Sequence, residues 1–155
     1  MRGHRALLMI KGLQHQSAKN FRNRSKWLQL LLDQSLDIPD SEISDLNLGP
    51  QAEGLLFSAM SAFCSAGWIS VTILCQAALD AALWENHKFE GIERNKITTG
   101  RDYIWLRNKR NALLHVDQSG PAITIHSYAV DDASMERDAK RSMQLAIKGL
   151  ADFLR

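Results

Sequence analysis

The segment 106–115 concentrates side chains that can act on a phosphodiester. Its sequence, Leu-Arg-Asn-Lys-Arg-Asn-Ala-Leu-Leu-His, holds three cations, two amides and one imidazole. An imidazole can move a proton near neutral pH, and a guanidinium can grip a phosphate and stabilise the charge that develops on it. With RNA, the ribose 2′-hydroxyl is an internal nucleophile, so cleavage by such a group requires neither a metal ion nor a protein nucleophile.

The helical spacing of these residues leaves two interpretations open. On an ideal helix Arg107, Asn108, Asn111 and His115 fall within roughly a third of a turn, and the long side chain of Arg110 can swing towards them. A basic helix end is also commonly a solvated face, and a histidine in a last turn interacts favourably with the helix dipole. Spacing alone favours the solvated face.

A resemblance changes that balance. The residues Arg110-Asn111-Ala112-Leu113-Leu114-His115 resemble the signature of HEPN domains, the higher eukaryotes and prokaryotes nucleotide-binding family. In that signature an Arg is followed, usually, by Asn, Asp or His, and then by a His that is separated from the Arg by four to six residues; here four residues lie between them. The resemblance covers residues 15–155 as architecture, but only residues 110–115 as a motif.

The resemblance implies a metal-independent endoribonuclease that acts as a homodimer, with two motifs facing each other across an interface cleft. His115 would be the general acid or base, Arg110 would bind the scissile phosphate, and Asn111 would position groups. The implied partners are RNA, a second copy of the chain and an antitoxin protein, since several HEPN proteins are toxins or antiviral effectors. No cofactor is implied. The alternative is a non-catalytic HEPN-like module that binds RNA, nucleotide or a protein partner.

Further residues are assigned to the cleft on weaker grounds. Arg107, Asn108 and Lys109 are candidate contacts to the RNA backbone. Asp117 stands where a subset of HEPN toxins carries a Tyr that a partner enzyme modifies, which makes that mode of neutralisation doubtful here. Gln76 and Asp80 either line the cleft opposite the motif or serve packing.

The apolar periodicity predicts an all-α, up-and-down bundle of four main helices in a single domain of residues 1–155. Residues 1–15 are expected to be a peripheral extension with a short helix at 6–14. Connectors are expected at 36–50 and 86–99, and a short β-like segment near 122–128. The main helices are expected at 18–35, 51–85, 101–115 and from Asp131 or Asp132 to 154.

The distribution of charge and the two cysteines indicate which ligands the chain could bind. The net charge is only +2, yet residues 1–32 carry seven Lys or Arg and no acid, so basic zones at 1–26 and 94–110 are candidate phosphate contacts. Cys64 and Cys75 cannot pair within one continuous helix, and no Cys/His cluster has zinc-ligand spacing.

The expected location is cytoplasmic, because the apolar run at 6–10 is too short for a signal peptide. The uncharged stretch 54–79 is long enough to cross a bilayer. A buried helix is favoured over a membrane span there, because polar residues recur on one side of it.

Overall fold

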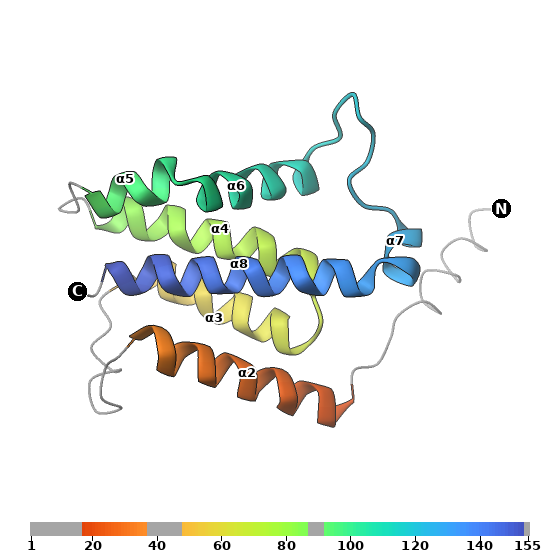
Figure 1. The fold of residues 1–155 in the computed structure, drawn as a ribbon, viewed down its shortest axis with the longest axis horizontal. Coiled ribbons are helices and arrows are strands. Elements are labelled where there is room, and N and C mark those ends of the chain that lie inside the picture. The colour runs from red at the N-terminus through yellow and green to blue at the C-terminus, as the bar shows by residue number, and fades with distance from the viewer. Residues whose placement is uncertain (1–16, 37–47, 87–91, 154–155) are drawn as a thin grey trace.

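Helix α4 lies at the centre of the molecule, as the computed structural model of the chain shows (Figure 1). The structure describes residues 17–36, 48–86 and 92–153. Helices α3 and α8 pack directly on α4, and α6 lies along another side of it. Helix α2 packs on the far side of α3 and α8 from α6 (Figure 1). The helices are α2 (Ala18–Leu36), α3 (Pro50–Cys64), α4 (Trp68–Glu85), α5 (Ile92–Thr99), α6 (Arg101–Leu114), α7 (Ile125–Val130) and α8 (Asp132–Asp152).

The sequence of α4 explains its central position. The helix is apolar on almost every side and carries a single acid, Asp80, between Trp68 and Ala82, and a helix of that kind is stable only when other elements cover most of its surface. By contrast, α8 has a strongly one-sided apolar stripe that packs on α4. The buried residues of the core include Phe63, Trp68, Val71, Cys75, Leu79, Leu106, Met143, Ile147 and Leu150.

The expected long helix over 51–85 is wrong, because the structure has two helices there. Helix α3 ends at Cys64 and α4 begins at Trp68. Between them Ala66 adopts a left-handed conformation with φ of 60°, and the N–H of Gly67 donates to the carbonyl of Ala62 (2.7 Å). A Cβ at Gly67 would lie 3.3 Å from that same carbonyl oxygen. The close approach of backbone to backbone therefore suits glycine, and the chain reverses here instead of merely bending.

The β-like segment expected near 122–128 is also wrong, since α7 begins at Ile125. The reason is a capping box: the Thr124 and Ser127 side chains satisfy each other's backbone N–H groups, so the helix starts despite the alternating pattern. The connector expected over 86–99 contains α5 in its second half. Ile97 of α5 is buried, which fixes this short helix to the core.

The prediction of an all-α protein is confirmed for the described residues, which contain helices and one isolated bridge but no strand. Helices α2, α6 and α8 agree with the expected ones to within two residues at each end. Both cysteines are free and buried, and within the described ranges no helix is long and apolar enough to span a membrane. The helix expected at 6–14 lies outside the described residues.

Two glycines should respond oppositely to alanine. A Cβ at Gly149, which is buried on α8, would lie 2.8 Å from Leu79 Cδ2 and 3.1 Å from the Tyr103 hydroxyl, whereas a Cβ at Gly54, which is exposed on α3, would meet nothing within 4 Å. Gly149→Ala should lower the free energy of unfolding by about 1 kcal/mol, because overpacking exceeds the gain in helix propensity. Gly54→Ala should raise it by about 1 kcal/mol. Urea unfolding at one protein concentration measures both, and a stabilised Gly149→Ala protein would contradict the packing described here.

Candidate active site at the end of α6

Arg110 lies on the side of α6 that faces α4, and its guanidinium forms an ion pair with Asp80 of α4. Its Nη2 lies 3.7 Å from Oδ2 of Asp80, and only 28% of the Arg110 side chain is exposed, against 52% for Asp80. The other oxygen of the carboxylate, Oδ1, accepts a hydrogen bond from Nε2 of Gln76 (2.8 Å). Gln76 and Asp80 are one helical turn apart on α4, so a line of polar groups runs from α4 to the guanidinium.

Gln76 is the most unusual member of this line. It is 3% exposed, and its Oε1 has no hydrogen-bond partner in the part of the chain that the structure describes. A buried carbonyl without a partner costs about 1–3 kcal/mol. The sequence thus keeps an amide in the core whose one described hydrogen bond orients Asp80, and Asp80 in turn faces Arg110.

Asn111 and His115 lie further along the same helix end, and both are exposed. His115 follows the last residue of α6. Its N–H donates to the Asn111 carbonyl (3.0 Å), and its backbone is extended, with φ of −129° and ψ of 134°. His115 is therefore the C-terminal cap of α6, and on an ideal helix its position lies about 140° around the axis from that of Arg110. In the described residues no hydrogen bond joins His115 to Arg110.

Asp117 lies two residues after His115, and its side chain stabilises a turn. Its Oδ1 accepts hydrogen bonds from the hydroxyl and the backbone N–H of Ser119, and these bonds lower the pKa of the Asp117 carboxyl. The backbone of Asp117 also pairs with Gly120. This carboxylate holds a reverse turn that begins two residues after His115, and its described bonds lead to Ser119.

The three candidate RNA-backbone residues lie on different sides of α6. Nη2 of Arg107 donates to the carbonyl of Thr98 at the end of α5 (3.0 Å), and Nζ of Lys109 lies 2.6 Å from Oδ2 of Asp138 on α8. Asn108 is exposed. Both cations thus tie α6 to its neighbours, and an RNA phosphate would have to compete with those bonds.

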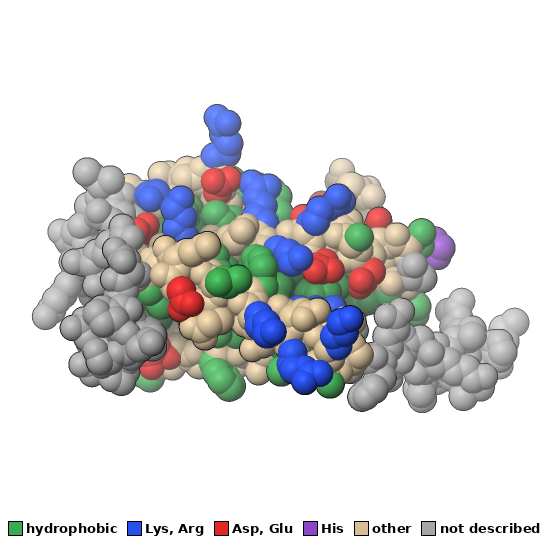
Figure 2. Space-filling view, turned by 60° about the horizontal axis from the view of Figure 1, so that its bottom comes forward, with side chains coloured by type: hydrophobic (Ala, Val, Ile, Leu, Met, Phe, Trp, Pro, Cys, Tyr) green, Lys and Arg blue, Asp and Glu red, His purple; other side chains and the backbone are tan. Residues whose placement is uncertain are grey.

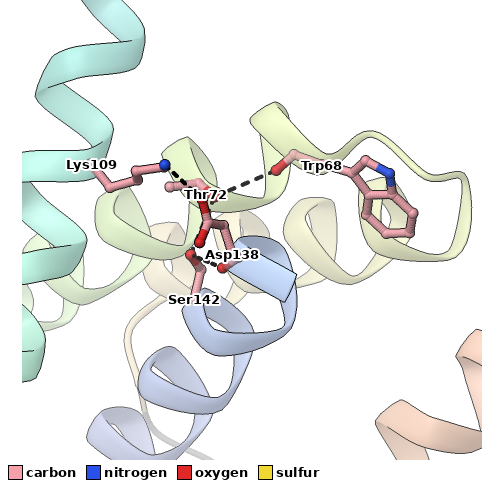
Figure 3. A network of polar contacts seen from close by, with 5 residues as sticks. All are labelled: Trp68, Thr72, Lys109, Asp138 and Ser142. Carbon is pink, nitrogen blue, oxygen red and sulfur yellow. Dashed lines mark hydrogen bonds and ion pairs between the residues drawn. The ribbon is translucent and has the colours of Figure 1, made fainter. Parts of the chain in front are cut away.

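Lys109 ends a polar network that sequence analysis missed (Figure 3). Its partner Asp138 accepts, through the backbone carbonyl, a hydrogen bond from the hydroxyl of Ser142 (2.7 Å). That hydroxyl lies 3.2 Å from Oγ1 of Thr72, with both groups buried, and Thr72 bonds back to the Trp68 carbonyl. The i, i+4 spacing of Asp138 and Ser142 was visible in the sequence, but nothing in it indicated that they would face α4 and α6.

A cavity of about 100 Å³ lies beside this network, between α4, α6, α7 and α8. Its wall includes Lys109 and Asp138, and also Leu113 on the next turn of α6. It does not include Arg110, Asn111 or His115. Within the described residues, no cluster of three or more His, Cys, Asp or Glu side chains could hold a metal ion.

Apolar side chains lie one helical turn from both members of the Asp80–Arg110 pair. Positions 73, 77, 80, 81 and 84 recur on one side of α4, and among them Trp84 is 75% exposed while Ile73, Ala77 and Ala81 are partly exposed. On α6, Ile104 and Leu114 are exposed as well. These exposed or partly exposed apolar residues of α4 and α6, together with the Asp80–Arg110 pair, are named here the α4/α6 face.

Comparisons with protein-family models, with curated proteins and with solved structures find no match to this chain. Any functional assignment therefore rests on the residues and geometry just described.

Proposed function

We propose that the chain is a metal-independent endoribonuclease of the HEPN type, which acts as a homodimer through Arg110, Asn111 and His115. The observation that carries the proposal is the end of α6. There a half-buried guanidinium faces an acid on α4 (3.7 Å), while an exposed amide and an exposed imidazole follow it on the same helix end.

The proposed reaction is attack of the 2′-oxygen of RNA on the adjacent phosphorus. An imidazole accepts the proton of the 2′-hydroxyl, the P–O5′ bond breaks, and an imidazolium returns a proton to the departing 5′-oxygen. The products are a 2′,3′-cyclic phosphate and a free 5′-hydroxyl. A single imidazole cannot occupy both sides of the phosphorus at once, so two copies of His115, one from each subunit, fit the two proton transfers.

Arg110 would stabilise the phosphorane-like transition state. A guanidinium has five N–H donors, and the single contact with Asp80, from Nη2 at 3.7 Å, leaves donors for two phosphate oxygens. Asp80, oriented by Gln76, is then a positioning residue that restricts the swing of a long side chain. Pre-ordering of this kind lowers the entropy lost on reaching the transition state.

Dimerisation is proposed through the α4/α6 face, which would bring the two copies of the site together. Trp84→Glu should weaken such a dimer by about 2 kcal/mol or more, roughly 30-fold in its dissociation constant, because large aromatic anchors dominate interfaces. Sedimentation velocity should give a dimer for the wild type and a monomer for the variant, with cleavage lost in parallel. Leu30→Glu, at another exposed apolar position on α2 (59% exposed), is the control and should stay dimeric. A wild-type protein that cleaves RNA as a monomer would contradict the shared site.

The direct test is cleavage of single-stranded RNA by the purified chain in excess EDTA, with product ends identified by mass spectrometry. Cyclic phosphate ends support the proposal. RNA binding without cleavage at any protein concentration would favour the alternative, a non-catalytic RNA-binding module. The biological role proposed is that of a toxin in a toxin–antitoxin or phage-defence pair, in which an antitoxin protein would cover the site.

A further inference from the structure

The N-terminal half of α2 carries positive charge without interleaved acids. Lys19, Arg22 and Lys26 are exposed, and their i, i+3, i+7 spacing puts them in one row on the outward side of the helix. No Asp or Glu occurs before Asp33. In Figure 2, which views the molecule from the α2 side, Lys and Arg side chains gather near the N-terminal end of this helix.

This arrangement of cations destabilises α2 itself. Cations near the first turn meet the positive end of the helix dipole, and Arg22 and Lys26 are like charges one turn apart. Two of the cations on α8 are arranged differently: Lys140 pairs with Glu136 (2.9 Å) and Arg141 with Asp102 (2.9 Å). A helix face that only contacts solvent is more stable when positive and negative side chains alternate on it. The row of cations without acids on α2 therefore indicates an anionic partner.

An open groove borders the row on its α8 side, with a volume of about 430 Å³. Two amides, Asn20 and Asn23, line its α2 edge, and Lys140 lines its α8 edge together with its ion-pair partner Glu136. The Lys140 Nζ lies 5.9 Å from the ring centroid of Trp27. Amides can donate to and accept from ribose and base edges, while cations meet phosphates. The groove therefore offers the donors that a nucleic-acid strand uses, next to the charges that would attract it.

We propose that the row Lys19, Arg22 and Lys26, with the adjoining α2/α8 groove, is a second RNA-binding surface that contacts the sugar-phosphate backbone. From Lys19 to Lys26 the row is about 10 Å long, which matches about three phosphates at the axial spacing of a stacked strand. The choice of RNA over other polyanions rests on the proposed function. A nuclease whose Arg107 and Lys109 already bind protein groups needs phosphate contacts elsewhere, and α2 supplies them away from α6 (Figure 1).

The test compares two triple variants of equal charge in a His115→Ala background, which keeps the RNA intact. One is Lys19→Gln/Arg22→Gln/Lys26→Gln. The control is Arg101→Gln/Arg137→Gln/Lys148→Gln, which removes three exposed cations that have acids beside them or one turn away. Fluorescence anisotropy with a labelled single-stranded RNA of about 20 nucleotides, longer than a typical single-strand site, measures affinity from low to high salt.

The α2 variant should bind about 10- to 100-fold more weakly near 0.1 M salt, and the slope of log K against log salt should fall by about 2, as expected for three lost phosphate contacts. The control should change affinity by about twofold. Equal losses in both variants would reduce the effect to net charge and overturn the inference. So would unchanged RNA binding with lost binding to phosphatidylcholine/phosphatidylserine vesicles, which would assign the surface to an anionic membrane.

Failure of the inference and failure of the proposed function give different results. If the chain with His115 intact never cleaves RNA but the α2 variant still loses RNA affinity, the nuclease fails and the RNA surface stands. If cleavage in EDTA is found but the α2 variant binds RNA like the control, the nuclease stands and the second surface is overturned.

Discussion

His115→Ala should abolish RNA cleavage, with a fall in kcat/KM of about 10²–10⁴-fold. That range is typical for the loss of a positioned general acid or base, and in the proposed dimer the substitution removes both imidazoles at once. Cleavage is measured in EDTA on a defined single-stranded RNA. The exposed position of His115 makes a change in stability beyond about 0.5 kcal/mol unexpected, so inactivity would not reflect unfolding.

A matched control separates this result from a contaminating nuclease or a general effect of losing a histidine. His126, exposed on α7, lies outside the proposed site, and His126→Ala should cleave at the wild-type rate. RNA with a 2′-deoxy sugar at the cleavage position should resist the wild type, because the internal nucleophile is missing. Undiminished activity of His115→Ala would refute the assignment of the imidazole.

The same variant tests the toxin role in cells. Expression of the wild-type chain in a bacterial host should slow growth, whereas His115→Ala should not. Equal growth of the two strains, with both proteins present in equal amounts, would count against a toxin even if the purified protein cleaves RNA.

Helix content was predictable from the sequence because periodic apolar residues mark helices whatever they pack against. The stripe of α8, through Met143, Ala146 and Leu150, placed that helix correctly. The division between α3 and α4 was not predictable in this way. The residues on both sides are good helix formers, and the reversal depends on Ala66 taking a left-handed conformation, which alanine adopts only when tertiary packing compensates for it.

At the candidate site, too, the features that depend on neighbouring residues in the sequence were predictable, and the contacts between distant residues were not. The spacing of Arg110, Asn111 and His115 was a local property, and the helix end that carries them was located to within one residue. The partners of Arg107 and Lys109 were not local: Thr98 belongs to an unpredicted helix, and Asp138 belongs to α8. Sequence charge alone therefore made them resemble phosphate ligands, although in the structure they join helices.

Arg110 gives the second large effect, and lysine is the most informative replacement. Arg110→Ala should lower kcat by about 10²–10³-fold, the loss expected when one preorganised donor group to a developing oxyanion is removed. Arg110→Lys keeps the charge but loses the planar pair of donors, so it should recover at most a small part of the activity. Single-turnover cleavage with saturating protein measures the chemical step apart from RNA binding.

Asp80→Asn distinguishes positioning from catalysis at this site. Asparagine keeps an oxygen that can accept the Gln76 hydrogen bond but loses the charge that faces Arg110, so a moderate fall in kcat with unchanged RNA affinity is expected. Since Asp80 is half exposed and 3.7 Å from Arg110, losing the pair should change the free energy of unfolding by less than about 1 kcal/mol. If Arg110→Lys retained full kcat, any point charge would suffice and the two-pronged grip on the phosphate would be wrong. If Asp80→Asn matched Arg110→Ala instead, the carboxylate would itself belong to the catalytic group.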